Sequence, residues 1–436
     1  MPGPRFPLAI PSDSDFPLSN IPFGIFTTDE NTTPRTGTAV GTLILDLALV
    51  EKHGLLGGLA GSTSFFSHAT LNAFAAQPAA VRTAVRARII ELLQDGSSAL
   101  FADAALNAVA FVQQSRAVMH LPMTIGDFSD FMCAEVHVTN CSKMDNAPGA
   151  PPNFFAMPTA YNGRASSVIV SGTPVRRPRG MLRMTGSPPS FAFVPTARID
   201  YELEMGIFIS QPVPFGTTIS SADAAREHIF GLVMLNDWTA RDVQFTEKTP
   251  LGPFNGKGSG TTISPWVVTL DALAGAEVAG TDAHALANMA TRPPYLRHDA
   301  PAHTWNIRVT AALQRDAWPG GPVDVSASNL SALYWTPAQM VAYHASSGCG
   351  LRTGDLLGTG TISSPEPAEG AGPGVYSLGC LHELSKAGTQ AFKLANGEEI
   401  IFVEDGDEVL LRGQVVRADG STIGFGECRG RIEPVI

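Results

Sequence analysis

Cysteine is scarce in this sequence, and the few cysteines form no recognisable pattern. Five occur in 436 residues, an odd number, and no two make a CxxC pair: Cys133, Cys141, Cys349, Cys380 and Cys428. We therefore expect neither a disulfide framework nor a structural zinc site. The simplest interpretation is a reduced, cytoplasmic protein.

Blocks of basic residues and long apolar runs are also lacking. Lys and Arg total 29 against 40 Asp and Glu, which gives a net charge of −11. Nucleic acid and anionic membrane surfaces are therefore not expected as partners. No apolar stretch reaches the roughly 18 residues that a membrane span requires. The first residues, MPGPRFPLAIPSDSDF, have no charged region leading into an apolar run and do not predict a secretory signal.

Glycine and proline are abundant instead, with 43 and 33 copies, beside hydrophobic and charged shares of 44% and 16%. This composition is typical of a globular, turn-rich and strand-rich protein. At about 150 residues per domain, the length allows two full cores. From about residue 120 the sequence consists of short apolar runs separated by Gly and Pro. We therefore predict an N-terminal domain at 1–118 and a second domain at 119–436.

The N-terminal domain shows one hairpin pattern and one helical pattern. Gly37–Leu47 alternates apolar and small residues around a glycine turn, as in a β-hairpin. Val81–Leu93 has apolar residues at helical spacing and stops before Asp95-Gly96. Residues 103–118 are open to a further helix or an extended arm.

The second domain alternates short apolar runs with Gly and Pro, which predicts many strands. The expected strands are Val168–Gly172, Ile199–Ile209, Ile263–Leu270, Trp305–Leu313, Ile400–Leu411 and Gln414–Ala418. Two helices are expected between them, Ser221–Leu235 and Thr336–Ser346. Pro337 falls in the first turn of the second helix, where proline is permitted.

The run Arg198–Met205 carries the clearest chemical signal. Its alternation places Asp200, Glu202 and Glu204 on one face of a strand and apolar residues on the other. Glu202 and Glu204 would lie about 7 Å apart, near enough to share one cation. A solvated polar face is the plain alternative. The apolar continuation to Ile209 favours a central strand, where like charges need a neutralising cation.

Three further segments concentrate polar groups. Thr124–His137 contains Asp130 and His137, and Leu235–Gln244 follows an expected apolar helix. Pro250–Pro265 is a glycine-rich loop with one lysine. It does not match a phosphate-binding Walker A loop, because Gly258 follows Lys257 where Ser or Thr is required.

Together these motifs resemble the fumarylacetoacetate hydrolase family, and the resemblance covers nearly the whole chain. The matching segments are Asp13–Pro17, Pro22–Gly24, His120–Phe131, Tyr161–Ser167, Val170–Pro174, Tyr201–Glu204, Asn236–Asp242, Gly260–Trp266, Asp355–Ser363 and Glu404–Val409. The resemblance implies a mainly β, α+β fold: a small SH3-like N-terminal domain and a mixed β-sandwich roll for catalysis. It also implies a homodimer.

The resemblance further implies hydrolysis of a carbon–carbon bond in an acidic β-diketone, by water that a histidine activates beside a divalent cation, Mg²⁺ or Ca²⁺. The implied metal ligands are Asp130, Glu202, Glu204 and Asp237, an all-oxygen set that hard cations prefer. The implied base is His137, held by Glu383, since a carboxylate fixes the imidazole tautomer. Groups implied to stabilise the oxyanion are Arg241, Gln244 and Lys257. Arg241 could equally be a structural partner of Asp237 or Asp242.

The resemblance implies that Tyr161 and Thr361 hold the terminal carboxylate of the substrate. Packing is the alternative for Tyr161, and a turn hydrogen bond for Thr361. This part of the sequence also departs from the family pattern. An expected arginine is absent from the loop after His137, where only Lys143 is near, Lys248 replaces a tyrosine, and Asn162 replaces a histidine.

Three hypotheses follow. The first is cleavage of 4-fumarylacetoacetate to fumarate and acetoacetate, in tyrosine and phenylalanine catabolism. The second keeps the chemistry but changes the substrate to another diketone or an acylpyruvate, with hydrolysis, decarboxylation or isomerisation in a specialised pathway. The third is a non-catalytic scaffold, which would be expected to lose a base or a metal ligand, whereas this chain retains both.

Overall fold

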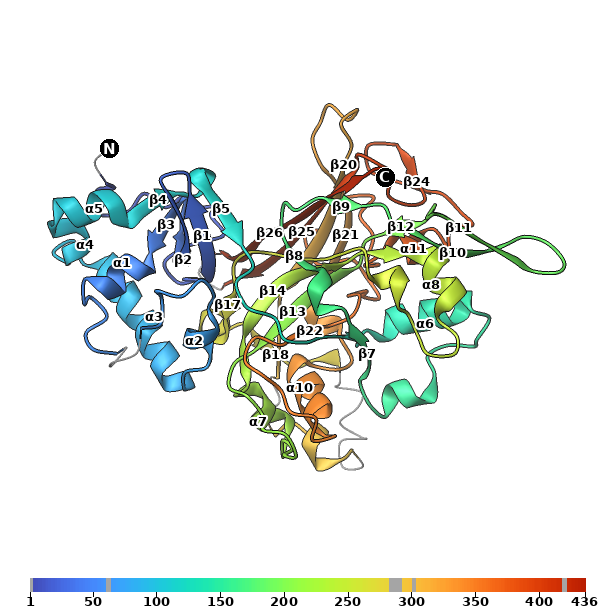
Figure 1. The fold of residues 1–436 in the computed structure, drawn as a ribbon, viewed down its shortest axis with the longest axis horizontal. Helices are drawn as coiled ribbons and strands as arrows, with labels where there is room; N and C mark the ends of the chain where they lie inside the picture. The colour runs from blue at the N-terminus through green and yellow to red at the C-terminus, as the bar shows by residue number, and fades with distance from the viewer. Residues whose placement is uncertain (1–2, 60–63, 282–291, 300–302, 418–421) are drawn as a thin grey trace.

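The structure is a computed structural model that describes residues 3–59, 64–281, 292–299, 303–417 and 422–436. Its N-terminal part contains a five-stranded antiparallel sheet in the order β4-β3-β2-β1-β5 (Figure 1). The strands are β1 (Phe23–Thr28), β2 (Asn31–Val40), β3 (Leu43–Asp46), β4 (Phe111–Gln113) and β5 (Ala117–His120). The helices are α1 (Leu47–Lys52), α2 (Asn72–Ala75), α3 (Ala79–Gln94), α4 (Ala99–Ala102) and α5 (Ala104–Ala110).

The predictions for the N-terminal part agree with these elements. The hairpin at Gly37–Leu47 is the β2–β3 pair, in which Val40 faces Leu43. Gly41 turns the chain with φ +57°, a value that glycine adopts without steric cost. The predicted helix at Val81–Leu93 is α3. Residues 103–118 contain a helix and extended segments, α5, β4 and the start of β5.

Two larger sheets build the rest of the molecule. The first has the order β7-β6-β22-β13-β14-β16-β8, with β17 also pairing with β14, and the second has the order β21-β20-β25-β26-β9. The first comprises β6 (Phe128–Met132), β7 (Thr159–Gly163), β8 (Val168–Val170), β13 (Leu203–Ile209), β14 (Ile229–Asp237), β16 (Thr261–Ile263), β17 (Val268–Thr269) and β22 (Leu356–Gly358). The second comprises β9 (Val175–Arg176), β20 (Arg308–Gln314), β21 (Val323–Asn329), β25 (Glu408–Val416) and β26 (Thr422–Glu433).

Shorter elements connect the sheets and cover their edges. The helices are α6 (Glu135–Met144), α7 (Ala222–Arg226), α8 (Arg241–Glu247), α10 (Pro337–Ala345) and α11 (Leu381–Leu384). The strands are β10 (Arg179–Met184), β11 (Ser190–Pro195), β12 (Ile199–Asp200), β15 (Thr239–Ala240), β18 (Glu277–Val278), β19 (Thr304–Trp305), β23 (Phe392–Lys393) and β24 (Glu399–Ile400). Helix α10 confirms the helix expected at Thr336–Ser346, and Thr336 and Gln339 form a capping box at its start.

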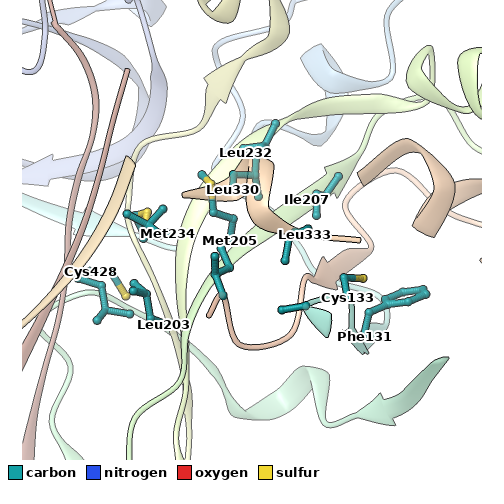
Figure 2. Close-up of a cluster of buried hydrophobic side chains, with 14 of the residues drawn as sticks. Phe131, Cys133, Leu203, Met205, Ile207, Leu232, Met234, Leu330, Leu333 and Cys428 are labelled. Atoms are coloured by element: carbon teal, nitrogen blue, oxygen red, sulfur yellow. The ribbon is translucent and has the colours of Figure 1, made fainter. Parts of the chain in front are cut away.

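Apolar side chains of β13 and β14 form the centre of the main core. Leu203, Met205 and Ile207 lie on one face of β13, near Leu232 and Met234 of β14 (Figure 2). The other face of β13 is buried as well, since all seven residues of the strand are buried. A strand covered on both sides leaves Glu204 no access to water, so its charge must be compensated within the protein.

One predicted helix is wrong. The segment Ser221–Leu235 forms the short helix α7 and then the long strand β14, so the polar segment after it follows a strand. The run IFGLVML is buried on both faces and is therefore apolar throughout, and periodicity alone does not separate such a strand from a buried helix.

Several predicted strands have different limits. Ile199–Ile209 is divided into β12 and β13, and Ile263–Leu270 is broken after β16 before β17 begins. Trp305–Leu313 is divided into β19 and β20. The two runs Ile400–Leu411 and Gln414–Ala418 contribute instead to β24 and to a single strand β25 that ends at Val416, because Gly413 passes through the ladder at a register shift. Ala418 lies outside the described residues.

The fold class is confirmed as mixed α+β and rich in strands, with a small N-terminal domain and a larger β-rich C-terminal domain. The predicted limit between residues 118 and 119 falls within β5. Within the described ranges, no helix is both long enough and apolar enough to cross a membrane.

Candidate active site

Four carboxylates converge at one end of the large sheet. Asp130 belongs to β6, Glu204 to β13, and Asp237 ends β14. Glu202 immediately precedes β13. All four side chains are buried, and one carboxylate oxygen of each lies within 4.8 Å of one oxygen of every other. The two glutamates are therefore not on a solvated face, and the structure brings them together with both aspartates.

The strand order explains this convergence. Strand β22 lies between β6 and β13, and Gly358 of β22 pairs with Asp130 on one side and Gly206 on the other. A Cβ at Gly358 would stand 2.6 Å from Oδ1 of Asp130 and 3.1 Å from Oε2 of Glu204. Glycine at this position therefore lets two carboxylates from the flanking strands approach each other across β22.

The electrostatics of this cluster fit a hard divalent cation. Burial, followed by the charge of Asp237, raises the pKa of Asp130 to about 8, and burial and Asp130 raise the pKa of Glu204 well above its usual range. Oδ1 of Asp130 and Oε1 of Glu204 are buried and accept no hydrogen bond from any described residue. Two buried carboxylate oxygens without partners in a four-carboxylate cluster match the ligands that Mg²⁺ and Ca²⁺ take.

Two cationic side chains border the cluster. Nζ of Lys257 donates to Oδ2 of Asp237 at 2.7 Å and also to Glu202, and Arg241 lies 2.8 Å from Oε1 of Glu202. Burial opposes ionisation of Glu202, but Lys257 and Arg241 outweigh it and lower the pKa of this carboxyl. The second partner of Arg241 is Asp200, whose Oδ2 accepts from Nε at 2.8 Å, so neither Asp237 nor Asp242 takes that place.

His137 and Glu383 form a buried pair beside the cluster. Nδ1 of His137 lies 2.7 Å from Oε2 of Glu383, which also accepts from Ser363, while Asn140 donates to Oε1 at 2.8 Å. Burial lowers the pKa of His137, but Cys141 and Glu383 outweigh it, and the net shift is upward. The imidazole is therefore held at Nδ1, which leaves Nε2 for a proton transfer.

A cavity of about 430 Å³ opens onto these groups. Gln244, Tyr161, Thr361 and Lys248 line it together with His137, Arg241 and Lys257. The Tyr161 hydroxyl donates to Oδ2 of Asp237 at 2.7 Å, so this tyrosine contacts a predicted metal ligand. Oγ1 of Thr361 is buried without a partner among the described residues, so the alternative of a turn hydrogen bond has no support. Nζ of Lys248 donates to Oδ2 of Asp145 at 2.6 Å.

Several residues of the site were not predicted. Asp200 clamps Arg241 and accepts from the backbone of α11, and Thr261 donates to Asp237 at 2.9 Å. Cys141 and His382 line the cavity. Asp200 and Thr261 stand within sequence motifs noted above, so position in a motif could have indicated them. Nothing local marks Cys141 or His382.

The model of the fumarylacetoacetate hydrolase C-terminal domain matches residues 128–433, and that of the fumarylacetoacetase N-terminal domain matches residues 19–122. The chain belongs to the fumarylacetoacetate hydrolase family. It is 42% identical to the fumarylacetoacetase of Bos taurus over 98% of both chains, and 41% identical to that of Arabidopsis thaliana over 97% of both.

The fungal fumarylacetoacetase of Aspergillus fumigatus is 38% identical to the chain over 98% of both sequences. Among solved structures, a fumarylacetoacetate hydrolase from Exiguobacterium antarcticum superposes with a TM-score of 0.50 at 16% identity, covering 95% of this chain and 99% of that one. This structural similarity supports the fold. Identity of about 40% to fumarylacetoacetases along nearly the whole chain identifies the protein as a hydrolase.

Proposed function

We propose that the protein hydrolyses 4-fumarylacetoacetate to fumarate and acetoacetate, as a step of tyrosine and phenylalanine catabolism. The observation that carries the proposal is the combination of about 40% identity to fumarylacetoacetases along nearly the whole chain with a buried four-carboxylate cluster beside a His–Glu pair. The reaction adds water to one carbonyl of the diketone and breaks the bond between that carbonyl carbon and the acetoacetate carbon.

His137 would act as the general base. Glu383 fixes Nδ1, so Nε2 can take a proton from water as the water oxygen bonds to the carbonyl carbon. The electron pair of the broken carbon–carbon bond leaves with acetoacetate as an enolate. The proton held on His137 can then pass to the enolate carbon, and the new fumarate carboxyl releases its own proton to solvent.

Arg241, Gln244 and Lys257 would stabilise the oxyanion that forms on the attacked carbonyl. Arg241 is buried and fixed by Asp200, and Gln244 stands one helical turn further on α8 with its Oε1 3.4 Å from the Arg241 guanidinium. Fixed cations aimed at developing charge cost no reorganisation when the reaction occurs.

Asp130, Glu202, Glu204 and Asp237 would hold Mg²⁺ or Ca²⁺. Bound there, the cation would polarise the oxygens of the diketone and stabilise the departing enolate. The unsatisfied oxygens of Asp130 and Glu204 support this assignment. An all-oxygen ligand set of this kind suits both ions.

A different diketone or an acylpyruvate is the second candidate substrate. It is favoured by one observation, the ion pair of Lys248 with Asp145 at the rim of the cavity, together with Lys143 in the loop where an arginine was expected. Lysine binds a carboxylate as a point charge and does not offer the two parallel donors of arginine. The cavity would then grip a terminal carboxylate less rigidly, through Tyr161, Thr361 and Lys248.

The proposed assembly is a homodimer in the cytoplasm. The β10–β11 hairpin projects from the body of the molecule (Figure 1), and Met181 faces Phe193 across it. Met181, Phe191 and Phe193 are at least half exposed, at 50%, 56% and 62%, while the opposite face touches Val243 of α8. An exposed apolar hairpin supports contact with a second chain. Light scattering of the purified protein measures its mass directly, and a monomer at micromolar concentration would exclude this assembly.

The proposed reaction is tested by the loss of the diketone absorbance when purified, metal-saturated protein meets fumarylacetoacetate. His137→Ala should lower the rate by about 10²–10⁴-fold while metal binding persists, because a general base is removed and no ligand is lost. His228→Ala is the matched control, since the His228 imidazole hydrogen-bonds the backbone carbonyl of Gln211 and does not line the cavity. If the wild type turns over an acylpyruvate but not fumarylacetoacetate, the second candidate substrate replaces the first. No turnover of either would favour the scaffold.

A further inference from the structure

Cys141 lies one helical turn after His137 on α6, and its sulfur touches the imidazole. Sγ stands 3.6 Å from Nε2 and 3.9 Å from Nδ1 of His137. The nearer nitrogen is therefore Nε2, the one that Glu383 does not hold. The arrangement therefore holds a thiol within reach of a proton acceptor.

Cys141 also lines the cavity, which contains polar groups that await a ligand. Oγ1 of Thr361 and Nδ1 of His382 have no hydrogen-bond partner among the described residues, and both side chains belong to residues only 2% exposed. Buried polar groups that lack protein partners are costly, and a bound molecule can satisfy them. Cys141 thus lines the same cavity as two residues with unpaired polar atoms that a polar organic molecule can satisfy.

The other four cysteines differ from Cys141 in ways that can be tested. Cys133, Cys380 and Cys428 are fully buried. Cys349 is exposed and has its own histidine, with Sγ 3.4 Å from Nδ1 of His344, but it does not line the cavity. Cys349 is therefore a matched Cys–His pair outside the site.

We propose that Cys141 is a site of covalent modification by α,β-unsaturated carbonyl compounds that enter the cavity, and that this alkylation inactivates the enzyme. The proposal rests on the proposed function in one respect, since 4-fumarylacetoacetate itself belongs to this chemical class. A thioether on Cys141 fills the space in front of His137 and prevents water from reaching Nε2.

The modification is a conjugate addition of a thiol to an alkene. It needs no oxidant, reductant or other co-reactant. The Cys141 thiol gives its proton to His137, and the sulfur bonds to the alkene carbon distant from the carbonyl. The π pair of the alkene moves toward the carbonyl as an enolate. The enolate carbon then takes the proton back from His137, so the product is a neutral thioether.

The test uses N-ethylmaleimide on the metal-loaded wild type, Cys141→Ser and Cys349→Ser, each followed by residual activity and by peptide mass spectrometry. We expect a thioether on Cys141 in the wild type, equal inactivation of the wild type and Cys349→Ser, and at least tenfold slower inactivation of Cys141→Ser relative to its own untreated rate. Mapping the adduct in the wild type does not depend on any variant.

Two results would overturn the inference: labelling of Cys349 with none on Cys141, or equal inactivation of the wild type and Cys141→Ser. If fumarylacetoacetate is not a substrate, the adduct on Cys141 still forms with N-ethylmaleimide. If it is a substrate and Cys141 remains unmodified, the proposed function stands and this inference fails.

Discussion

Nδ1 of His137 lies 2.7 Å from Oε2 of Glu383, although 246 positions of the chain separate the two residues. His137 stands in the first turn of α6 and Glu383 in the short helix α11. Burial opposes the charge of Glu383, but His137, Asn140 and Ser363 outweigh it and lower the pKa of this carboxyl to about 2. The carboxylate is therefore ionised near neutral pH, and it can hold one imidazole tautomer.

Replacing Glu383 by Gln should lower kcat by about 10- to 100-fold and shift the acid limb of the pH–rate profile. A base works only when neutral, so activity rises as pH passes upward through the pKa of His137. Because the charge of Glu383 raises that pKa, its removal should move the limb to lower pH. Ser363→Ala, which removes one donor to Glu383 and keeps its charge, is the control. An unmoved limb in Glu383→Gln would exclude Glu383 as the group that orients the base.

Metal binding should release protons and strengthen as pH rises. The pKa of Asp130 is raised to about 8 and that of Glu204 is raised well above its usual range, so both carboxyls of the metal-free protein hold protons that a cation must displace. Calorimetric titration with Mg²⁺ in two buffers of different ionisation enthalpy counts the released protons. Affinity that is independent of pH between about 5 and 8 would contradict the shift of Asp130.

The same pKa shifts predict how the stability of the metal-free protein depends on pH. A carboxyl whose pKa is higher in the folded than in the unfolded protein stabilises the fold at low pH. That stability is lost as pH rises from the unfolded value near 4 through about 8. Thermal melts should therefore show a falling Tm for the metal-free protein across this range and a flatter profile once Mg²⁺ is bound.

Lys257→Met should separate metal binding from catalysis. Nζ of Lys257 donates to Asp237 and Glu202, so the lysine competes with a cation for two carboxylates. Its removal should tighten Mg²⁺ binding, while the loss of an oxyanion donor should lower kcat by about 10²–10³-fold. Lys393→Met, at an exposed position of β23, should change neither quantity. Weaker Mg²⁺ binding in Lys257→Met would show that the lysine supports the cluster without competing for it.

Substitutions of Lys248 and of its partner Asp145 should affect KM differently. Lys248→Met removes a cation from the rim of the cavity and should raise KM for a dicarboxylate substrate about tenfold with little change in kcat. Asp145→Asn releases Lys248 from its partner and should lower KM or leave it unchanged. A rise of KM in both variants would mean that the ion pair holds the rim together and does not bind substrate.

An arginine introduced in the loop at Lys143–Asn146 should shift preference toward fumarylacetoacetate.

The local part of the site could be predicted from the sequence. Alternation along Arg198–Met205 placed Glu202 and Glu204 together, and the apolar run after them correctly indicated a central strand. The same rule grouped Asp200 with the two glutamates. In the structure, Asp200 pairs with Arg241, because the chain leaves β12 at Tyr201 and begins a new strand at Leu203.

The other parts of the site depend on contacts between segments that are distant in the sequence, and the periodicity of a sequence does not predict such contacts. Asp130 meets Glu204 only because β22, more than 200 residues after β6, lies between their strands. The partnership of Lys248 with Asp145, 103 positions away, has no local signal. Similarity to a family supplied the catalytic and metal positions, and their roles stay predictions until the variants above are measured.

The central claim is that four carboxylates share one divalent cation beside His137. Anomalous diffraction from crystals soaked in Mn²⁺, a substitute for Mg²⁺ with a strong anomalous signal, tests it most directly. We predict one dominant peak per chain within about 2.5 Å of an oxygen from each of Asp130, Glu202, Glu204 and Asp237. A peak elsewhere, or none at saturating Mn²⁺, would contradict the account.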